Sequence, residues 1–287
     1  AEKLEENAIS LAASNGFETF VIELSNLKEQ SKKGIELLTA LLKSPNYTQD
    51  TLNKLKTMQT GSLKRKENDF DYVANNQLKS VLFKGTTLEN SAAGTIESIS
   101  KIELKDIENF ISQTVCLENL IIVAGGDFEL KEFEKLVKPL LETLNVGKKA
   151  QLEEVNFISK KEEKVLIKDT QQAYIYFGSS FNINSKDEEN YKAKVASFIL
   201  GGSGFGSRLM EEIRVKRGLA YSAYGSISIN KSHSYFNGYL QTKNESAEEA
   251  QKLVSQLVSQ FVEHGVTQEE LTASKNFLTG SEPLRSE

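Results

Sequence analysis

The residues best suited to chemistry lie together in one segment, residues 201–222, which reads GGSGFGSRLMEEIRVKRGLAYS. Arg214 can donate several hydrogen bonds to a carboxylate or an oxyanion, and the phenol of Tyr221 can donate one more. The glycines before them could let a backbone approach a ligand closely, or they could let two helices pack across a bend. Spacing alone favours the simpler interpretation, in which Arg214 is a surface charge and Tyr221 packs in a strand.

Other chemistries find weaker support. A phosphate-binding GxGxxG loop would need glycine at position 207, which is Ser207. A hydrolytic zinc site needs about three protein ligands, usually including two histidines on one rigid element. The chain has only His233, expected at an exposed hairpin position, and His264, expected at the end of a helix. We expect neither to bind zinc. Cys116 has no second cysteine to pair with, and its apolar neighbours predict a buried, inert thiol.

Composition sets the broad class of the protein. The chain has 287 residues, of which 39% are hydrophobic and 26% charged, as is typical of a globular protein with room for two domains. Its net charge of -5 is spread along the sequence and argues against binding to nucleic acid. No apolar run approaches the roughly 20 residues of a membrane span. We therefore expect no nucleic-acid partner and no membrane span.

Apolar patterning predicts a mixture of strands and helices. In the first half we expect strands at 9–15, 17–25 and 116–128, and helices at 31–44, 48–83, 101–113 (capped by Ser100) and 128–144. In the second half we expect strands at 164–181, 219–230 and 233–244, and helices at 187–200, 207–217, 245–265 and 267–281. The strand at 116–128 contains LIIVAGG and is expected to be buried.

The two halves repeat one another. A shift of 219 positions aligns residues 48–62 with residues 267–281, with seven identities in fifteen positions. We therefore predict the α+β class with two tandem homologous domains, each a mostly antiparallel sheet covered by helices. The expected boundaries are 1–145 for the first domain, 146–163 for a linker and 164–287 for the second domain. Comparison of the copies also predicts that the first lacks its N-terminal part and the second its C-terminal part.

The segment GGSGFGSRLMEEIRVKRGLAYS resembles the C-terminal-domain signature of the insulinase/pitrilysin superfamily of zinc metallopeptidases. The branch it resembles includes mitochondrial processing peptidase and bacterial relatives, and the likeness extends to KSPNYTQDTLNKLK and GTIESISKIELKDIENF. The resemblance implies one half of a clamshell that encloses an unfolded peptide. It further implies that Arg214 and Tyr221 reach the zinc site of an opposing domain and hydrogen-bond the scissile carbonyl or its oxyanion. Gly201, Gly202, Ser203 and Gly204 would line the chamber near the substrate.

The departures from this family concern the metal. The superfamily's His-x-x-Glu-His motif belongs to a part of the first domain that would precede Ala1. The position of its third ligand aligns with Ser62, or alternatively Gln59, and neither is a carboxylate. The segment KLEENAISLAASNGFETFVIEL is similar to the start of non-catalytic partner subunits.

These observations favour a subunit of a zinc-dependent endopeptidase that acts on extended peptides. A homologous subunit, in a homo- or heterodimer, would hold the zinc, and this chain would bind none. One alternative is a catalytically complete zinc metalloendopeptidase whose motif lies upstream. A second alternative is a non-enzymatic core or scaffold subunit.

Overall fold

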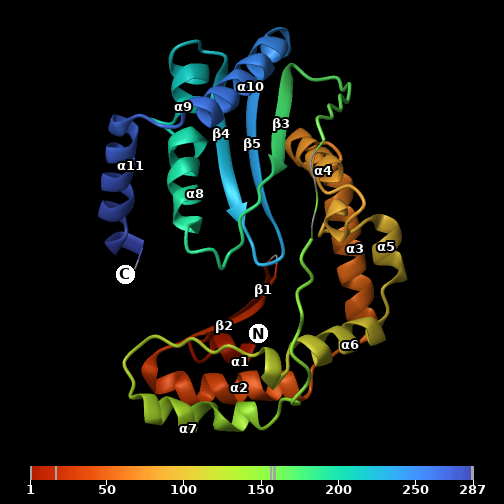
Figure 1. Cartoon of the computed structure of the whole chain (residues 1–287). Helices are drawn as coiled ribbons and strands as arrows, with labels where there is room; N and C mark the ends of the chain where they lie inside the picture. Colours follow the sequence, from red (N-terminus) through yellow and green to blue (C-terminus); the bar gives the residue numbers. More distant parts are fainter. Residues whose placement is uncertain (1, 17, 156, 158–159, 286–287) are drawn as a thin grey trace. The chain divides into compact units, whose positions relative to one another are not determined.

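The computed structural model describes residues 2–16, 18–155, 157 and 160–285 (Figure 1). Its contacts divide the chain into two compact units. Unit 1 comprises Ala1–Ser62 and Thr95–Leu152, and unit 2 comprises Leu63–Gly94 and Glu153–Glu287. The break at residue 152 falls inside the predicted linker. Residues 63–94, which the sequence predicted to lie in the first domain, belong to unit 2, because the helix at residues 70–82 packs on the sheet of unit 2.

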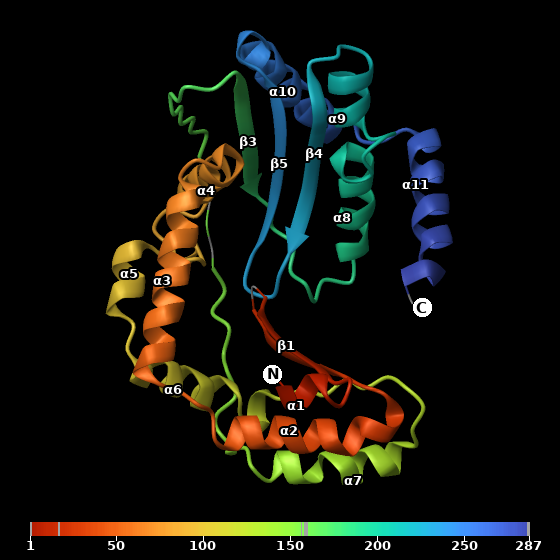
Figure 2. The same ribbon diagram turned by 180° about the vertical axis from the view of Figure 1, so that it is seen from behind.

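Unit 1 contains a two-stranded antiparallel sheet. Strands β1 (Ser10–Asn15) and β2 (Phe20–Ser25) pair from Ser10 opposite Ser25 to Asn15 opposite Phe20, as expected for two strands joined near Gly16. The helices of unit 1 are α1 (Glu2–Glu5), α2 (Ser31–Lys43), α3 (Gln49–Lys66), α5 (Ile96–Lys101), α6 (Leu104–Thr114) and α7 (Leu130–Leu141). Of these, α3 continues into unit 2, and α2 and α7 lie side by side in both views (Figures 1 and 2).

The packing of α2 on the sheet depends on Gly34. A β-carbon at this position would lie 3.3 Å from Cδ2 of Leu24 in β2 and 3.0 Å from Oδ1 of Asn26. Glycine therefore allows the helix to approach the strand closely. Leu38, one turn further along, is buried as well.

The prediction of a strand at residues 116–128 is wrong for the described residues. Residues Leu117–Asn119 form a 3-10 turn, η3, and residues 120–125 have no strand partner among the described residues. Ile121 is 81% exposed and Val123 is 90% exposed. A strand needs a neighbour to accept its backbone hydrogen bonds, so an apolar run alone does not make one. Cys116, in contrast, is fully buried, as expected.

Unit 2 is built on a three-stranded antiparallel sheet with the order β3-β5-β4. Its strands are β3 (Gln172–Ser180), β4 (Ala220–Ile229) and β5 (Ser234–Lys243). The β4–β5 hairpin confirms the sequence prediction. Strand β3 starts later than expected, because Gln172 pairs with Lys243, the last residue of β5.

Helices cover both faces of this sheet. Those in contact with it are α4 (Phe70–Leu82), α8 (Asn190–Ser197), α9 (Arg208–Met210) and α10 (Ala247–His264). The last helix, α11 (Gln268–Ser281), packs on α8. Leu240 and Phe236 of β5 face a core shared with α9 and α10, whereas Tyr235 and Tyr239 alternate to the opposite face. On that face, α4 contacts β3, and Phe70 meets the ring of Tyr174 edge to face at 5.7 Å. The core consists of Leu200, Leu209, Ile213, Ala220, Ala223, Phe236, Leu240, Ala250, Leu253, Val254 and Leu257.

The chain is thus a mixed α+β protein with small antiparallel sheets. The order strand, strand, helix, helix occurs twice, as β1, β2, α2, α3 and as β4, β5, α10, α11. Helix α3 begins at Gln49 and α11 at Gln268, which are 219 positions apart. A duplication would produce this recurrence. The division into two tandem homologous domains remains a prediction. No helix among the described residues has the length and apolar character to cross a membrane.

Candidate functional site

The site of interest lies in unit 2, where two π-helical turns flank a glycine-rich loop. The first turn, η4 (Phe198–Gly202), follows α8, and the second, η5 (Glu211–Val215), follows α9. In η5 the backbone N–H of Lys216 donates to the carbonyl of Glu211 at 2.9 Å, five residues back. Such π-turns are rare and occur often at functional sites. Arg214 is part of η5.

Buried residues anchor the segment that carries Arg214. Leu209 and Ile213 are fully buried in the core of unit 2. Ser207, also fully buried, caps α9: its hydroxyl accepts from the N–H of Met210 at 3.4 Å and donates to the carbonyl of Gly204 at 2.8 Å. Arg214 follows Ile213 directly and is half-buried, so its backbone is held in place by a fully buried neighbour.

Tyr221 is positioned by a turn and a bulge. Gly218 has a φ of 61°, the left-handed conformation that commonly ends a helix, and β4 begins two residues later. The register between β4 and β5 shifts between Ala220 and Ala223, which pair with Thr242 and Leu240. The bulge adds one residue to β4, so both alanines are buried while Tyr221 is 80% exposed. Bulges commonly redirect a side chain next to an active site.

The structure brings Arg214 and Tyr221 together and adds a third residue. The Cζ of Arg214 lies 4.6 Å from the centroid of the Tyr221 ring and 4.6 Å from the centroid of the Phe205 ring. Among the described ring contacts, none joins Phe205 to Tyr221, so each ring contacts the guanidinium separately. Phe205 was not expected from the sequence. The only feature of the sequence that could indicate Phe205 is its place as a single aromatic residue between two glycines, and loops without function also contain this pattern.

Arg214 has no ion pair within the described part of the chain. The nearby Glu212 carboxylate is taken by Lys216 and Arg217, both at 2.6 Å. These hydrogen bonds hold the pKa of Glu212 below its ordinary value, and the bond from Lys216 has the largest effect. Glu212 is therefore not the ion-pair partner of Arg214.

The rings of Phe205 and Tyr221 help to hold the Arg214 side chain in one orientation. Each exposed cation–π contact contributes about 0.5–1 kcal/mol. An arginine side chain has about 2 kcal/mol of rotamer entropy to lose when it is ordered. The two contacts of Arg214 together offset about half or more of this cost, whereas one alone would offset at most about half. The edge of the planar guanidinium keeps N–H donors for an acceptor, the arrangement suited to an oxyanion or a carbonyl.

The glycine cluster combines packing with turn geometry. Gly201 is buried, and a β-carbon there would lie 2.5 Å from the backbone nitrogen of Gly225 in β4. Gly202 is exposed, and Ser203 and Gly204 are half-buried. Gly204 has a φ of 67°, and Gly206 has a φ of 96°. Gly201 therefore allows η4 to pack closely on strand β4, and not two helices to pack across a bend as the sequence suggested. The turn at residues 204–206 presents Phe205 to solvent.

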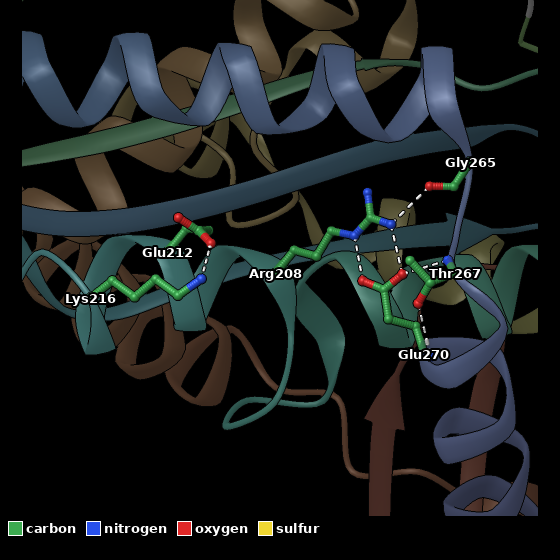
Figure 3. A network of polar contacts seen from close by, with 6 residues as sticks. All are labelled: Arg208, Glu212, Lys216, Gly265, Thr267 and Glu270. Carbon is green, nitrogen blue, oxygen red and sulfur yellow. Dashed lines mark hydrogen bonds and ion pairs between the residues drawn. The ribbon is translucent and has the colours of Figure 1, made fainter.

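An ion pair ties α9 to the last two helices (Figure 3). Arg208 Nε donates to Glu270 Oε1 at 2.6 Å, and its Nη2 donates to Oε2 at 2.7 Å and to the carbonyl of Gly265 at 2.8 Å. Glu270 also accepts from the N–H of Thr267, which caps α11. The Arg208 hydrogen bond lowers the pKa of Glu270 to about 2.

No group of three or more His, Cys, Asp or Glu side chains able to hold a metal ion occurs among the described residues. His264 ends α10, as expected. The expectation that His233 is exposed is wrong: it is only 6% exposed, because its ring packs against Phe83 and Tyr235. Both of its ring nitrogens have polar neighbours, Ser232 Oγ at 2.9 Å and Asn230 Nδ2 at 3.3 Å.

Comparison with known proteins identifies the family. Residues 101–278 match the family described as Peptidase M16 inactive domain. The chain belongs to this family. The resemblance to the insulinase/pitrilysin superfamily is thereby confirmed. A crystal structure of a peptidase M16 inactive domain from Pseudomonas fluorescens has the same fold, with a TM-score of 0.92 and 24% identity, over 98% of this chain and 68% of that one.

Two curated M16 relatives differ in how they are named. The chain is 45% identical over 287 residues to a protein of Helicobacter pylori named Non-peptidase homolog YmxG, covering all of this chain and 66% of that protein. It is 22% identical over 255 residues to an Uncharacterized zinc protease YmxG of Bacillus subtilis, covering 89% of this chain and 61% of that protein. The chain thus spans a little under two thirds of the length of these relatives.

Proposed function

We propose that this chain is a subunit of a zinc-dependent endopeptidase that acts on extended peptides. In this proposal Arg214 and Tyr221 bind the peptide carbonyl at the cleavage site, and a homologous partner subunit holds the metal. Bound zinc would polarise that carbonyl and activate a water molecule. The residues of this chain orient the peptide and donate hydrogen bonds to the carbonyl oxygen as negative charge develops on it.

The observation that carries the proposal is the state of Arg214. Its guanidinium has no ion pair among the described residues and contacts the rings of both Phe205 and Tyr221. A surface charge needs no fixed orientation to interact with solvent. A preorganised donor needs it, because ordering before the reaction removes the entropic cost during it.

The non-catalytic assignment has separate support. The relative that is 45% identical over the whole of this chain is named a non-peptidase homolog. The Bacillus subtilis relative, in contrast, is named a zinc protease, which favours the alternative of a catalytically complete enzyme. Both alternatives use Arg214 and Tyr221, and they differ in which chain supplies the zinc.

The test is peptide hydrolysis by the intact parent protein, alone and with its homologous partner subunit. Arg214→Ala and Tyr221→Phe should each lower kcat by about 100- to 1,000-fold, the usual effect of removing one oxyanion donor. Arg217→Ala is the matched control, since Arg217 is already paired with Glu212, and it should leave turnover unchanged.

Each result has a distinct meaning. Activity that requires the partner supports the subunit assignment, and activity of the parent alone with zinc supports the complete enzyme. If both Arg214→Ala and Tyr221→Phe retain full turnover in the active assembly, the proposed contacts are wrong. That outcome is the one a scaffold subunit predicts.

A further inference from the structure

Phe205 is a large apolar residue in an open position. It is 69% exposed at the tip of the loop between η4 and α9. Gly204 and Gly206 on either side both have positive φ, and a β-carbon on either would meet nothing within 4 Å. A single exposed phenylalanine is common on protein surfaces. This one contacts the candidate hydrogen-bond donor, which calls for an explanation.

The ring of Phe205 is one of the two supports of the Arg214 guanidinium. Tyr221, the other support, lies in a bulge of β4 and is fixed by the hairpin. Phe205 comes from a loop that is independent of that hairpin. The orientation of Arg214 therefore depends on the loop as well as on the strand.

Most of the Phe205 ring remains accessible beyond its contact with Arg214. An extended peptide rises about 3.4 Å per residue, so the side chains next to a carbonyl lie within a few ångströms of it. A carbonyl bound at the edge of Arg214 would bring a neighbouring side chain within reach of a ring only 4.6 Å from the guanidinium. An exposed aromatic face favours an apolar or aromatic side chain there.

We propose that Phe205 is a positioning and specificity-determining residue with two roles. It holds Arg214 in orientation, and it receives an apolar side chain of the peptide next to the carbonyl that Arg214 binds. This inference rests on the proposed function of Arg214 and extends it to the class of substrate. The preferred substrates are extended peptides with an apolar or aromatic residue beside the cleaved bond.

The two roles can be separated by three substitutions in the intact parent protein with its partner. Phe205→Leu keeps an apolar contact but removes the ring, so kcat should fall about 3- to 5-fold while the preference for apolar peptides remains. Phe205→Ala removes both roles, so in addition KM for apolar peptides should rise about 3- to 10-fold. Phe205→Trp keeps an aromatic ring, so the preference in KM for apolar over acidic peptides should remain.

Phe205→Trp also supplies a readout besides activity. The 287 residues contain no tryptophan, so the difference in emission between this variant and the wild type reports on this one position. Titration with an uncleavable extended peptide carrying phenylalanine at the test position should shift that emission to the blue and saturate. The same peptide carrying aspartate should bind at least about 3-fold more weakly.

The outcomes distinguish this inference from the function on which it rests. An unchanged emission at saturating peptide, or an unchanged peptide preference in Phe205→Ala, would overturn the role of Phe205. If Arg214→Ala keeps full turnover while the emission still reports apolar peptides, the function of Arg214 fails and the peptide contact of Phe205 stands. Circular dichroism of Phe205→Ala should match the wild type, because the side chain is mostly exposed.

Discussion

Arg208 and Glu270 form a bidentate ion pair that joins α9 to the start of α11 (Figure 3). Arg208 precedes Arg214 by six residues. Their side chains are 21% and 28% exposed, so solvent screens the pair only partly. The Arg208 hydrogen bond is the main cause of the lowered pKa of Glu270. The pair therefore couples the segment that carries Arg214 to the last helices in a pH-dependent way.

Glu270→Gln should lower the free energy of unfolding by about 1–2 kcal/mol at neutral pH, after allowance for partial exposure. The pKa of Glu270 is about 2 in the folded state and 4.5 ordinarily. A lowered folded-state pKa gives stability that is complete above the ordinary pKa and is lost as the pH falls through the folded one. Urea unfolding curves of wild type and variant should thus converge between pH 4.5 and about 2.

The control for this prediction is Glu248→Gln. Glu248 pairs with Lys252 one turn along α10, and both side chains are mostly exposed. Solvent screening leaves such a pair with little effect, so its removal should not change the midpoint of unfolding. A pH-independent loss of stability in Glu270→Gln would show that packing, and not the ion pair, stabilises the turn between α10 and α11.

Gly201→Ala should destabilise unit 2 by about 2–3 kcal/mol, because the new methyl group would lie 2.5 Å from Gly225 N and 2.8 Å from Leu209 Cδ1. The same substitution at Gly280, in α11, meets nothing within 4 Å. Gly280→Ala should instead stabilise the helix by about 0.5–1 kcal/mol. Thermal unfolding of the two variants should therefore shift in opposite directions. A neutral Gly201→Ala would mean that η4 can move away from β4.

Local patterns predicted much of the fold. The alternation in residues 219–244 and the apolar spacing in residues 245–281 identified the hairpin and the last two helices, because each has its own period. The strand expected at 116–128 could not be judged in this way, since a strand depends on a partner elsewhere in the chain. The burial of His233 has a similar origin, because Phe83 lies 150 positions away in sequence.

The candidate site was predicted in part. Arg214 and Tyr221 were identified from a motif, and the structure places them in contact. Phe205 and the β4 bulge were not foreseen, because both depend on how a loop and a strand meet in space. The π-turns could not be predicted either, because a π-turn differs from an α-helix only in a hydrogen bond that spans five residues and not four. The packing role of Gly201 becomes apparent only from its close approach to Gly225 in the structure.

Gly147→Ala should destabilise unit 1 by about 2–4 kcal/mol. Gly147 has a φ of 68°, and a β-carbon there would lie 2.3 Å from Cys116 Sγ. Gly85→Ala is the matched control, since Gly85 has a φ of 81° but no atom within 4 Å of such a β-carbon. It should show the backbone strain without the clash. The rate at which a thiol reagent labels Cys116, the only cysteine in the chain, should rise in Gly147→Ala and stay unchanged in Gly85→Ala.

The 287-residue chain should retain well under one equivalent of zinc after dialysis. Zinc binding to His233 would have to displace the polar neighbours of its ring, Ser232 and Asn230, and expose a buried aromatic cluster. His264 is exposed at the end of α10, and no metal-ligating cluster surrounds it among the described residues. One histidine alone binds zinc weakly, because stable sites need three or four ligands. Elemental analysis of wild type and His264→Ala, after zinc loading and dialysis, should give the same low content. A full equivalent that survives dialysis would contradict the assignment of the metal to another part of the assembly, and its loss in His264→Ala would locate the unexpected site.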